Sequence, residues 1–204
     1  MTQVKICGIT NVEDALAAEA FGADAVGFVF AENSPRYIEP EAAAAICVRL
    51  KAVRRVGVFV NRDVEEVKAI HKVCRLDFLQ LHGDESPSYC RAFPSSILIK
   101  AVSEDQEANP ELLQDYPVRA FLVDGRARGL RGGTGKTADW SAAREIGRRF
   151  RLILAGGLHP GNIEEALGSV RPDAVDIASG VERSPGRKDH GRMQELIRTV
   201  HTWR

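Results

Sequence analysis

Neither sign of charge is in excess in this sequence. Lysine plus arginine number 28 and aspartate plus glutamate also number 28, so the formal net charge is zero at pH 7. Proteins that bind DNA or RNA usually carry a basic excess, and its absence predicts that no nucleic acid is a partner. If the ligand carries a phosphate, we expect backbone N–H groups to hold it more than a cluster of lysines.

Cysteine and long apolar runs are also scarce. The 4 cysteines (Cys7, Cys47, Cys74 and Cys90) show no CxxC spacing and no clustered histidines, which disfavours a structural zinc site. A chain of 204 residues that is 44% hydrophobic can bury a core without disulfide bonds, so we expect reduced thiols and a cytoplasmic protein. No apolar run approaches the ~18 residues of a membrane span, and no signal peptide precedes Val4, so no membrane partner is expected.

What the sequence does contain is a repeated alternation of two patterns. Short apolar runs typical of strands are each followed by a stretch with the 3.6-residue period of a helix. The predicted strands are Val4–Cys7, Ala25–Phe30, Arg55–Val60, Phe78–Leu81, Ile97–Ala101, Ala120–Val123, Leu152–Leu154 and Ala174–Ile177. The predicted helices are Val12–Phe21, Pro40–Leu50, Val64–Cys74, Pro87–Phe93, Pro110–Asp115, Trp140–Phe150, Pro160–Val170 and Gly191–His201, with Asn11, Asp63 and Asp139 as N-caps.

Eight strand-then-helix units predict an α/β protein with parallel strands, because each return to the sheet needs a crossover helix. Eight such units close into a (β/α)₈ TIM barrel, for which about 200 residues is a short length. No linker or low-complexity segment interrupts them, so residues 1–204 are predicted to form a single domain. The alternative is an open doubly wound sheet, which would be expected to carry GxGxxG after its first strand; this chain has Gly8-Ile9-Thr10 there.

The stretch from Phe121 to Trp140 is the part most suggestive of a ligand site. An apolar run ends at Asp124, and glycines at positions 125, 129, 132, 133 and 135 follow before a helical pattern begins. Glycine lets backbone N–H groups approach an anion and a helix start adds partial positive charge, so this loop, Gly133 included, is predicted to bind phosphate. The end of the loop, Gly135-Lys136-Thr137, matches the end of a nucleotide-binding P-loop. Leu130 stands where that motif requires its first glycine, so we exclude ATP binding.

In a barrel, the residues that follow the strands form the active-site face. Polar or reactive residues follow six of the predicted strands: Cys7-Gly8, Ser34-Pro35-Arg36-Tyr37, Gln80-Leu81-His82-Gly83, Asp124, Ala155-Gly156-Gly157-Leu158 and Ser179-Gly180-Val181-Glu182. The two glycine junctions, Gly156-Gly157 and Ser179-Gly180, stand where such barrels commonly hold phosphate on backbone amides; ordinary tight turns are the alternative.

Two of these residues could form an acid–base couple across the barrel mouth. Cys7 is either a small buried apolar residue or a nucleophile or base, whose pKa helix dipoles or the nearby Lys5 would lower. Asp124 is either a cap or a loop salt bridge, or a general acid whose pKa burial at a strand end would raise.

Arg36 and His82 are open to two interpretations from the residues alone. An arginine suits a planar carboxylate by a bidentate contact, although a lone arginine more often lies solvated on the surface. An imidazole in a loop is frequently inert, and only its position after the fourth strand favours His82. The remaining histidines are expected to be structural or on the surface: His71, His159, His190 and His201.

Seven stretches of the chain together resemble one enzyme family. They are KICGIT (5–10), SPRYI (34–38), VGVFVN (56–61), LQLHG (79–83), GGTGKTADW (132–140), LAGGLHPGNI (154–163) and VDIASGVERSPGRKD (175–189). In this order they resemble the phosphoribosylanthranilate isomerases of tryptophan biosynthesis, and the resemblance covers nearly the whole chain.

The resemblance implies an Amadori rearrangement that uses no cofactor and no metal. The small phosphorylated substrate, an N-glycoside of anthranilate and ribose 5-phosphate, becomes an aminodeoxyribulose phosphate. By resemblance, Asp124 protonates the ribose ring oxygen as the general acid, and Cys7, as the thiolate, removes the C2 proton.

The resemblance also implies the binding residues. Arg36 would hold the anthranilate carboxylate, and backbone amides near Gly133, Gly156 and Ser179–Gly180 would hold the phosphate. Gln80, His82 and Asp176 are expected near the sugar, whereas GRARGLR (125–131) matches no motif.

Two other functions and two oligomeric states remain open at this stage. A broader isomerase that also accepts a histidine-pathway aminoaldose would be expected to use paired aspartates, and Cys7 speaks against it. A catalytically silent sensor of a phosphorylated ligand would require degraded acid–base positions, yet Cys7 and Asp124 are both present. The sequence is compatible with a monomer or a homodimer.

Overall fold

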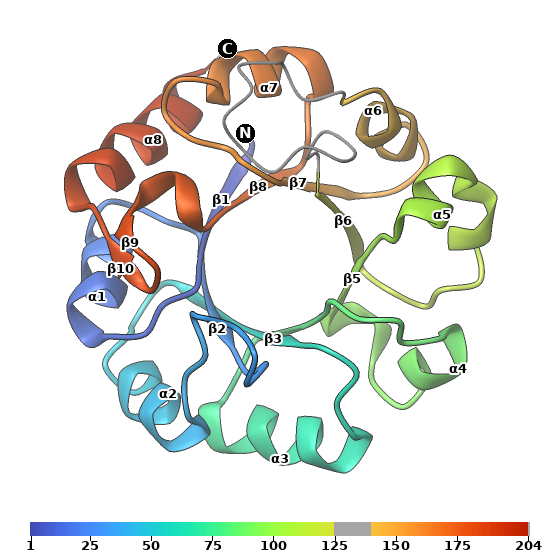
Figure 1. The fold of residues 1–204 in the computed structure, drawn as a ribbon, viewed down its shortest axis with the longest axis horizontal. Helices are drawn as coiled ribbons and strands as arrows, with labels where there is room; N and C mark the ends of the chain where they lie inside the picture. The colour runs from blue at the N-terminus through green and yellow to red at the C-terminus, as the bar shows by residue number, and fades with distance from the viewer. Residues whose placement is uncertain (125–139, 204) are drawn as a thin grey trace.

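The computed structural model describes residues 1–124 and 140–203, in which eight parallel strands close a barrel in chain order and helices cover its outside (Figure 1). The strands are β1 Gln3–Cys7, β2 Ala25–Val29, β3 Arg54–Phe59, β4 Phe78–Leu81, β5 Leu98–Ala101, β6 Ala120–Asp124, β7 Leu152–Ala155 and β8 Ala174–Ile177. The barrel closes where β8 pairs with β1, with Lys5 opposite Asp176. The predicted (β/α)₈ architecture is therefore confirmed.

The helices follow the predicted order. They are α1 Val12–Ala20, α2 Pro40–Cys47, α3 Val64–Cys74, α4 Pro87–Cys90, α5 Glu104–Ala108, α6 Ser141–Gly147, α7 Ile163–Val170 and α8 His190–Thr202, with 3₁₀ turns η1 Ser95–Ile97, η2 Pro110–Leu113 and η3 Ser179–Val181. Most are shorter than predicted, whereas α3 has the predicted bounds and α8 is longer. Asn11 and Asp63 cap α1 and α3 through their side chains as predicted, and Asp139 lies outside the described residues. Within the described part of the chain, no helix is long and apolar enough to cross a membrane.

The prediction is wrong between β5 and β6. The expected helix from Pro110 to Asp115 is the short 3₁₀ turn η2, and the α-helix of this unit, α5, precedes it. A helix of five residues has too few positions to show an apolar period. Helix α4 ends at Cys90 and not at Phe93 as predicted. Pro94 accounts for the exclusion of Phe93, because proline disfavours helical backbone at the residue before it.

Side chains of the strands alternate between the inside of the barrel and the helix layer. On β1, Val4 and Ile6 belong to the large core between strands and helices, which leaves Lys5 and Cys7 on the inward face. The barrel interior is filled by a second, smaller cluster of Val56, Ile99, Ala101, Ala120, Leu122, Ile153 and Ala155. This cluster and the inward-facing polar side chains fill the interior, so a ligand can enter only at the ends of the barrel.

A small antiparallel hairpin, β9 Glu182–Ser184 and β10 Arg187–Lys188, lies beside β1 and α1 at the rim (Figure 1). The sequence does not predict it, because strands this short and polar show no apolar alternation. Thr10 donates a hydrogen bond to the carbonyl oxygen of Gly186 (2.5 Å), and the backbone N–H of Lys188 donates to the carboxylate of Asp14 (2.8 Å). The hairpin thereby ties the end of the chain to the first βα junction.

Candidate active site

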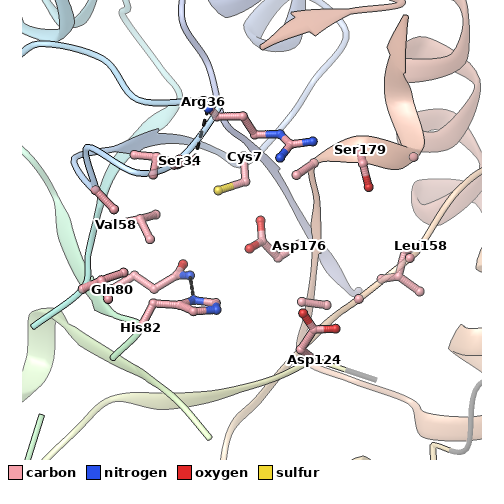
Figure 2. Close-up of a pocket in the computed structure, with 18 residues that line it drawn as sticks. Cys7, Ser34, Arg36, Val58, Gln80, His82, Asp124, Leu158, Asp176 and Ser179 are labelled. Atoms are coloured by element: carbon pink, nitrogen blue, oxygen red, sulfur yellow. Dashed lines mark hydrogen bonds between the residues drawn. The ribbon is translucent and has the colours of Figure 1, made fainter. Parts of the chain in front are cut away.

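A cavity of about 250 Å³ opens at the carboxyl ends of the barrel strands. Every described residue predicted for the site lines it: Cys7, Arg36, Gln80, His82, Asp124, Gly156, Gly157, Asp176, Ser179 and Gly180. Figure 2 shows the labelled side chains surrounding one space, with Cys7 and Asp124 on different sides and Asp176 between them. Gly133 and the rest of the predicted glycine-rich loop lie outside the described residues.

A larger cavity of about 440 Å³ lies at the opposite end of the barrel, among the starts of the strands. Its charged lining is largely structural: Asp77, for example, accepts hydrogen bonds from Arg54 and Arg55. Size therefore does not identify the functional site. The acid–base residues line the smaller cavity, where barrel enzymes carry their chemistry.

Cys7 ends β1 and is 7% exposed, next to Gly27 in the register of β2. A Cβ at Gly27 would lie 2.8 Å from Cys7 Sγ and 3.1 Å from Lys5 Nζ, so glycine is needed there to make room for both groups. Burial raises the pKa of the Cys7 thiol, and the carboxylate of Asp176 raises it further, whereas Lys5 and Lys188 lower it by less. The expectation of a lowered pKa is therefore wrong for this structure, because desolvation of the anion outweighs the neighbouring cations.

Lys5 and Asp176 form a buried ion pair across the β1–β8 junction. Lys5 Nζ lies 2.8 Å from Asp176 Oδ1, and both side chains are less than a tenth exposed. Burial by itself would lower the pKa of Lys5, but Asp176 and Cys7 outweigh it and raise that pKa. Lys5 therefore carries a positive charge inside the barrel at neutral pH.

Asp124 ends β6 and is partly buried at the cavity wall. Its neighbour on β7 is Ala155, which also lines the cavity. The strand register therefore turns this carboxylate to the space that Cys7 faces from β1 (Figure 2).

Gln80 and His82 form a polar wall on the β4 side of the cavity. Gln80 Nε2 lies 2.9 Å from His82 Nδ1, which makes Nδ1 the acceptor as the amide is oriented. Burial lowers the pKa of His82, so the ring is neutral near pH 7. The side-chain oxygen of Gln80 is buried without a hydrogen-bond partner among the described residues.

Arg36 is held in place by Glu182 of the hairpin, a contact that the sequence did not predict. Arg36 donates from Nε and Nη2 to the two carboxylate oxygens of Glu182, over 2.9 and 2.6 Å. Lys188 Nζ also donates to Glu182, over 2.9 Å. Burial would raise the pKa of Glu182, but Arg36 and Lys188 lower it overall, so the carboxylate remains ionised.

Two glycine-containing loops close the cavity on the β7–β8 side. Gly156 and Gly157 adopt positive φ angles of 89° and 66°, a region that favours glycine. A Cβ at Gly180 would overlap the carbonyl oxygen of Leu158, so the two loops touch through their backbones. This close approach is the geometry in which backbone amides can surround an anion. In residues 1–124 and 140–203, no group of three or more His, Cys, Asp or Glu could hold a metal ion.

Comparison with known proteins shows similarity along the whole chain. The family model described as N-(5'phosphoribosyl)anthranilate (PRA) isomerase matches residues 4–199. The N-(5'-phosphoribosyl)anthranilate isomerase of Syntrophus aciditrophicus is 50% identical over 204 residues, which are 100% of this chain and 89% of that protein.

Solved structures of the same kind superimpose closely. The phosphoribosyl anthranilate isomerase of Thermotoga maritima has a TM-score of 0.89 and 44% identity, over 98% of this chain and 99% of the other. A phosphoribosyl anthranilate isomerase in complex with reduced 1-(o-carboxyphenylamino)-1-deoxyribulose 5-phosphate has a TM-score of 0.85 and 43% identity, over 98% and 99% of the two chains.

Proposed function

This chain belongs to the N-(5'-phosphoribosyl)anthranilate isomerase family, and we propose that it rearranges its substrate with Asp124 as the general acid and Cys7 as the general base. It is an isomerase of tryptophan biosynthesis. The proposed reaction converts N-(5-phosphoribosyl)anthranilate into 1-(2-carboxyphenylamino)-1-deoxyribulose 5-phosphate. The observation that carries the two roles is that Cys7 and Asp124, from strands on different sides of the barrel, line one cavity.

The first step assigned to this site opens the sugar ring. Asp124 gives its proton to the ring oxygen, the bond from that oxygen to C1 breaks, and the anthranilate nitrogen supplies the electron pair that makes an iminium ion. A carboxyl group at a strand end, facing the cavity, is well placed to transfer a proton to a ligand oxygen. The aspartate returns to its acid form by taking up a proton later in the cycle.

The second step removes the C2 proton. The thiolate of Cys7 accepts this proton, and the electron pair of the C–H bond neutralises the iminium to give an enolamine. The enolamine then tautomerises: the C2 hydroxyl loses a proton and C1 gains one, so substrate and product contain the same atoms. One proton passes from the Cys7 thiol to the Asp124 carboxylate, through the enolamine or water, and restores both groups. Because burial favours the thiol form of Cys7, the step depends on groups that stabilise the thiolate.

The remaining residues of the cavity are assigned to binding. Arg36, already oriented by Glu182, would bind the anthranilate carboxylate through Nη1, which has no hydrogen-bond partner among the described residues. Gln80 and the neutral His82 would contact sugar hydroxyls, with Asp176 beside them. Backbone amides of 156–157 and 179–180 would hold the phosphate, together with the loop that contains Gly133.

The direct test is a time course of substrate loss. Phosphoribosylanthranilate is prepared in situ from anthranilate, and its fluorescence is followed after the protein is added. We expect rapid loss with the wild type and none with Cys7→Ala or Asp124→Asn, whereas Cys47→Ala, which changes a buried cysteine in α2, retains activity. Substantial turnover by either site variant would remove that residue from its role.

Negative results with the wild type would favour one of the alternatives. Turnover of the histidine-pathway aminoaldose in the same assay would indicate the broader isomerase. Phosphate binding without turnover of either substrate would indicate a sensor. We also propose one domain over 1–204, as a monomer or homodimer. One cooperative unfolding transition is expected, and light scattering distinguishes the two oligomeric states.

A further inference from the structure

We infer that Lys5 is a positioning residue that stabilises the thiolate of Cys7, and that Asp176 limits this effect by competing for Lys5. The inference rests on the proposed role of Cys7 as the base. Lys5 does not line the active-site cavity, whereas Cys7 and Asp176 do, so Lys5 acts on the reaction through Cys7.

The strand geometry brings the three groups together. Lys5 and Cys7 stand two positions apart on β1 and share its inward face, while Asp176 is the register partner of Lys5 on β8. Lys5 Nζ and Cys7 Sγ both lie about 3 Å from the position that a Cβ of Gly27 would occupy. The two atoms are therefore no more than about 6 Å apart, within the range over which an opposite charge stabilises an ion.

Lys5 and Asp176 shift the pKa of Cys7 in opposite directions. The positive charge of Lys5 lowers the pKa of Cys7, and the negative charge of Asp176 raises it. Water is largely excluded around all three groups, since Lys5, Cys7 and Asp176 are 4, 7 and 9% exposed. Screening is weak in such a place, so removal of one charge should have a large effect.

Other charged or titratable groups face this cluster from neighbouring elements. Toward the active-site cavity they are Lys188 of β10, Arg36 before α2, and His82 and Asp124 at the cavity wall. Lys5 also lines the cavity at the opposite end of the barrel, with Asp24, Arg54, Asp77, Arg119 and Arg151. Lys188 is committed to three hydrogen bonds with backbone carbonyls and Glu182, and Arg36 is committed to Glu182. Lys5 is the ammonium on the strand of Cys7 itself, and its charge lowers the pKa of the thiol.

This arrangement makes a prediction that a merely structural ion pair does not make. If Lys5 and Asp176 only held the barrel together, removal of either would disturb Cys7 in a similar way. If they act electrostatically, Lys5→Met should raise the midpoint of Cys7 ionisation, and Asp176→Asn should lower it. The two changes have opposite signs.

The experiment measures alkylation of Cys7 by iodoacetamide as a function of pH, in a chain whose Cys47, Cys74 and Cys90 are replaced by serine. Mass spectrometry identifies the modified residue. At a pH below the midpoint, moving the midpoint up by about one pH unit lowers the thiolate fraction about tenfold. A thiolate with a higher pKa is also more nucleophilic, which offsets part of the loss in thiolate fraction. We therefore expect the alkylation rate at about pH 8 to change at least about threefold. Alkylation should be slower in Lys5→Met and faster in Asp176→Asn.

Lys100→Met is the matched control. Lys100 and Glu85 form an ion pair as buried as that of Lys5 and Asp176, 3.2 Å apart, between β5 and the junction after β4. Its loss should reduce stability comparably and leave the ionisation midpoint of Cys7 unchanged. Steady-state kinetics adds a second readout: Lys5→Met should lower kcat with little change in KM, because Lys5 does not line the binding cavity.

Unchanged midpoints in both variants, or changes of the same sign in both, would overturn the inference. If Lys5→Met does not fold, Asp176→Asn serves as the background, and adding Lys5→Met to it should raise the midpoint again. Alkylation needs no turnover, so the result is separable from the proposed function. If Cys7→Ala retained turnover while Lys5→Met still raised the midpoint of Cys7 ionisation, Cys7 would not be the general base. The electrostatic effect of Lys5 on Cys7 would still hold.

Discussion

Lys188 donates a hydrogen bond from Nζ to the backbone carbonyl oxygen of Cys7 over 2.5 Å, although 181 positions separate the two residues in the chain. The same ammonium donates to the carbonyl oxygen of Ala178 over 3.2 Å and to Glu182 over 2.9 Å. The side chain of Lys188 is fully buried. One cation thus joins the end of β1, the junction after β8 and the carboxylate that orients Arg36.

Lys188→Met should lower both stability and turnover. The substitution removes the buried positive charge that pairs with the Glu182 carboxylate. We expect the free energy of unfolding to fall by about 3 kcal/mol. We also expect a lower kcat, because the main chain at Cys7 loses its anchor. Urea denaturation and initial rates measure the two effects. Lys72→Met, on the exposed face of α3, is the control and should change the free energy of unfolding by no more than about 0.5 kcal/mol. If Lys188→Met lowered stability and kcat no more than Lys72→Met does, the anchoring role of Lys188 would be contradicted.

Arg36 and Glu182 should affect substrate binding more than chemistry. Arg36→Ala removes the proposed carboxylate contact, and since that contact is present in both ground and transition states, KM should rise at least about tenfold with kcat little changed. Glu182→Gln keeps the size of the side chain and weakens the two hydrogen bonds that orient Arg36, so KM should rise by less. A defect confined to kcat in Arg36→Ala would argue against carboxylate anchoring.

Gly180→Ala tests the proposed phosphate site. The added Cβ would meet the carbonyl oxygen of Leu158, so the two loops must separate and their amides move. We expect the inhibition constant of inorganic phosphate to rise at least about tenfold. Gly168→Ala is the control, because a Cβ there meets only Trp203 at 4.0 Å and alanine favours helix α7. Unchanged inhibition by phosphate in Gly180→Ala would place the phosphate elsewhere.

Acid should destabilise the fold through Asp14 and Glu182. Burial would raise the pKa of Asp14, but hydrogen bonds from the Lys188 backbone, Asn11 and His190 lower it overall, and the pKa of Glu182 is lowered similarly. A group whose pKa is lower in the folded state contributes stability above its unfolded pKa and loses it as pH falls through the folded value. The free energy of unfolding should therefore decline below about pH 4.5. Asp14→Asn should make this decline shallower in urea titrations from about pH 3 to about pH 7. If the free energy of unfolding of Asp14→Asn fell with pH as steeply as that of the wild type, Asp14 would not be a source of the acid sensitivity.

Much of the site follows from where residues stand relative to the strands. The apolar runs ending at Cys7 and Asp124 became β1 and β6 within a residue of the predicted bounds, and the predicted site residues in the described part of the chain line one cavity. Local periodicity suffices for this, because the carboxyl ends of parallel barrel strands must meet on one face. The short polar elements α5, β9 and β10 carry no such period.

The sequence by itself therefore determined the barrel, the order of its units and the face on which the chemistry lies. Only the tertiary structure decided that Lys5 pairs with Asp176, that Glu182 holds Arg36, and that Lys188 reaches Cys7. These contacts join residues more than a hundred positions apart, and local pattern says nothing about such distances. The raised pKa of Cys7 has the same origin: the balance between burial and neighbouring charges depends on the three-dimensional surroundings of the thiol.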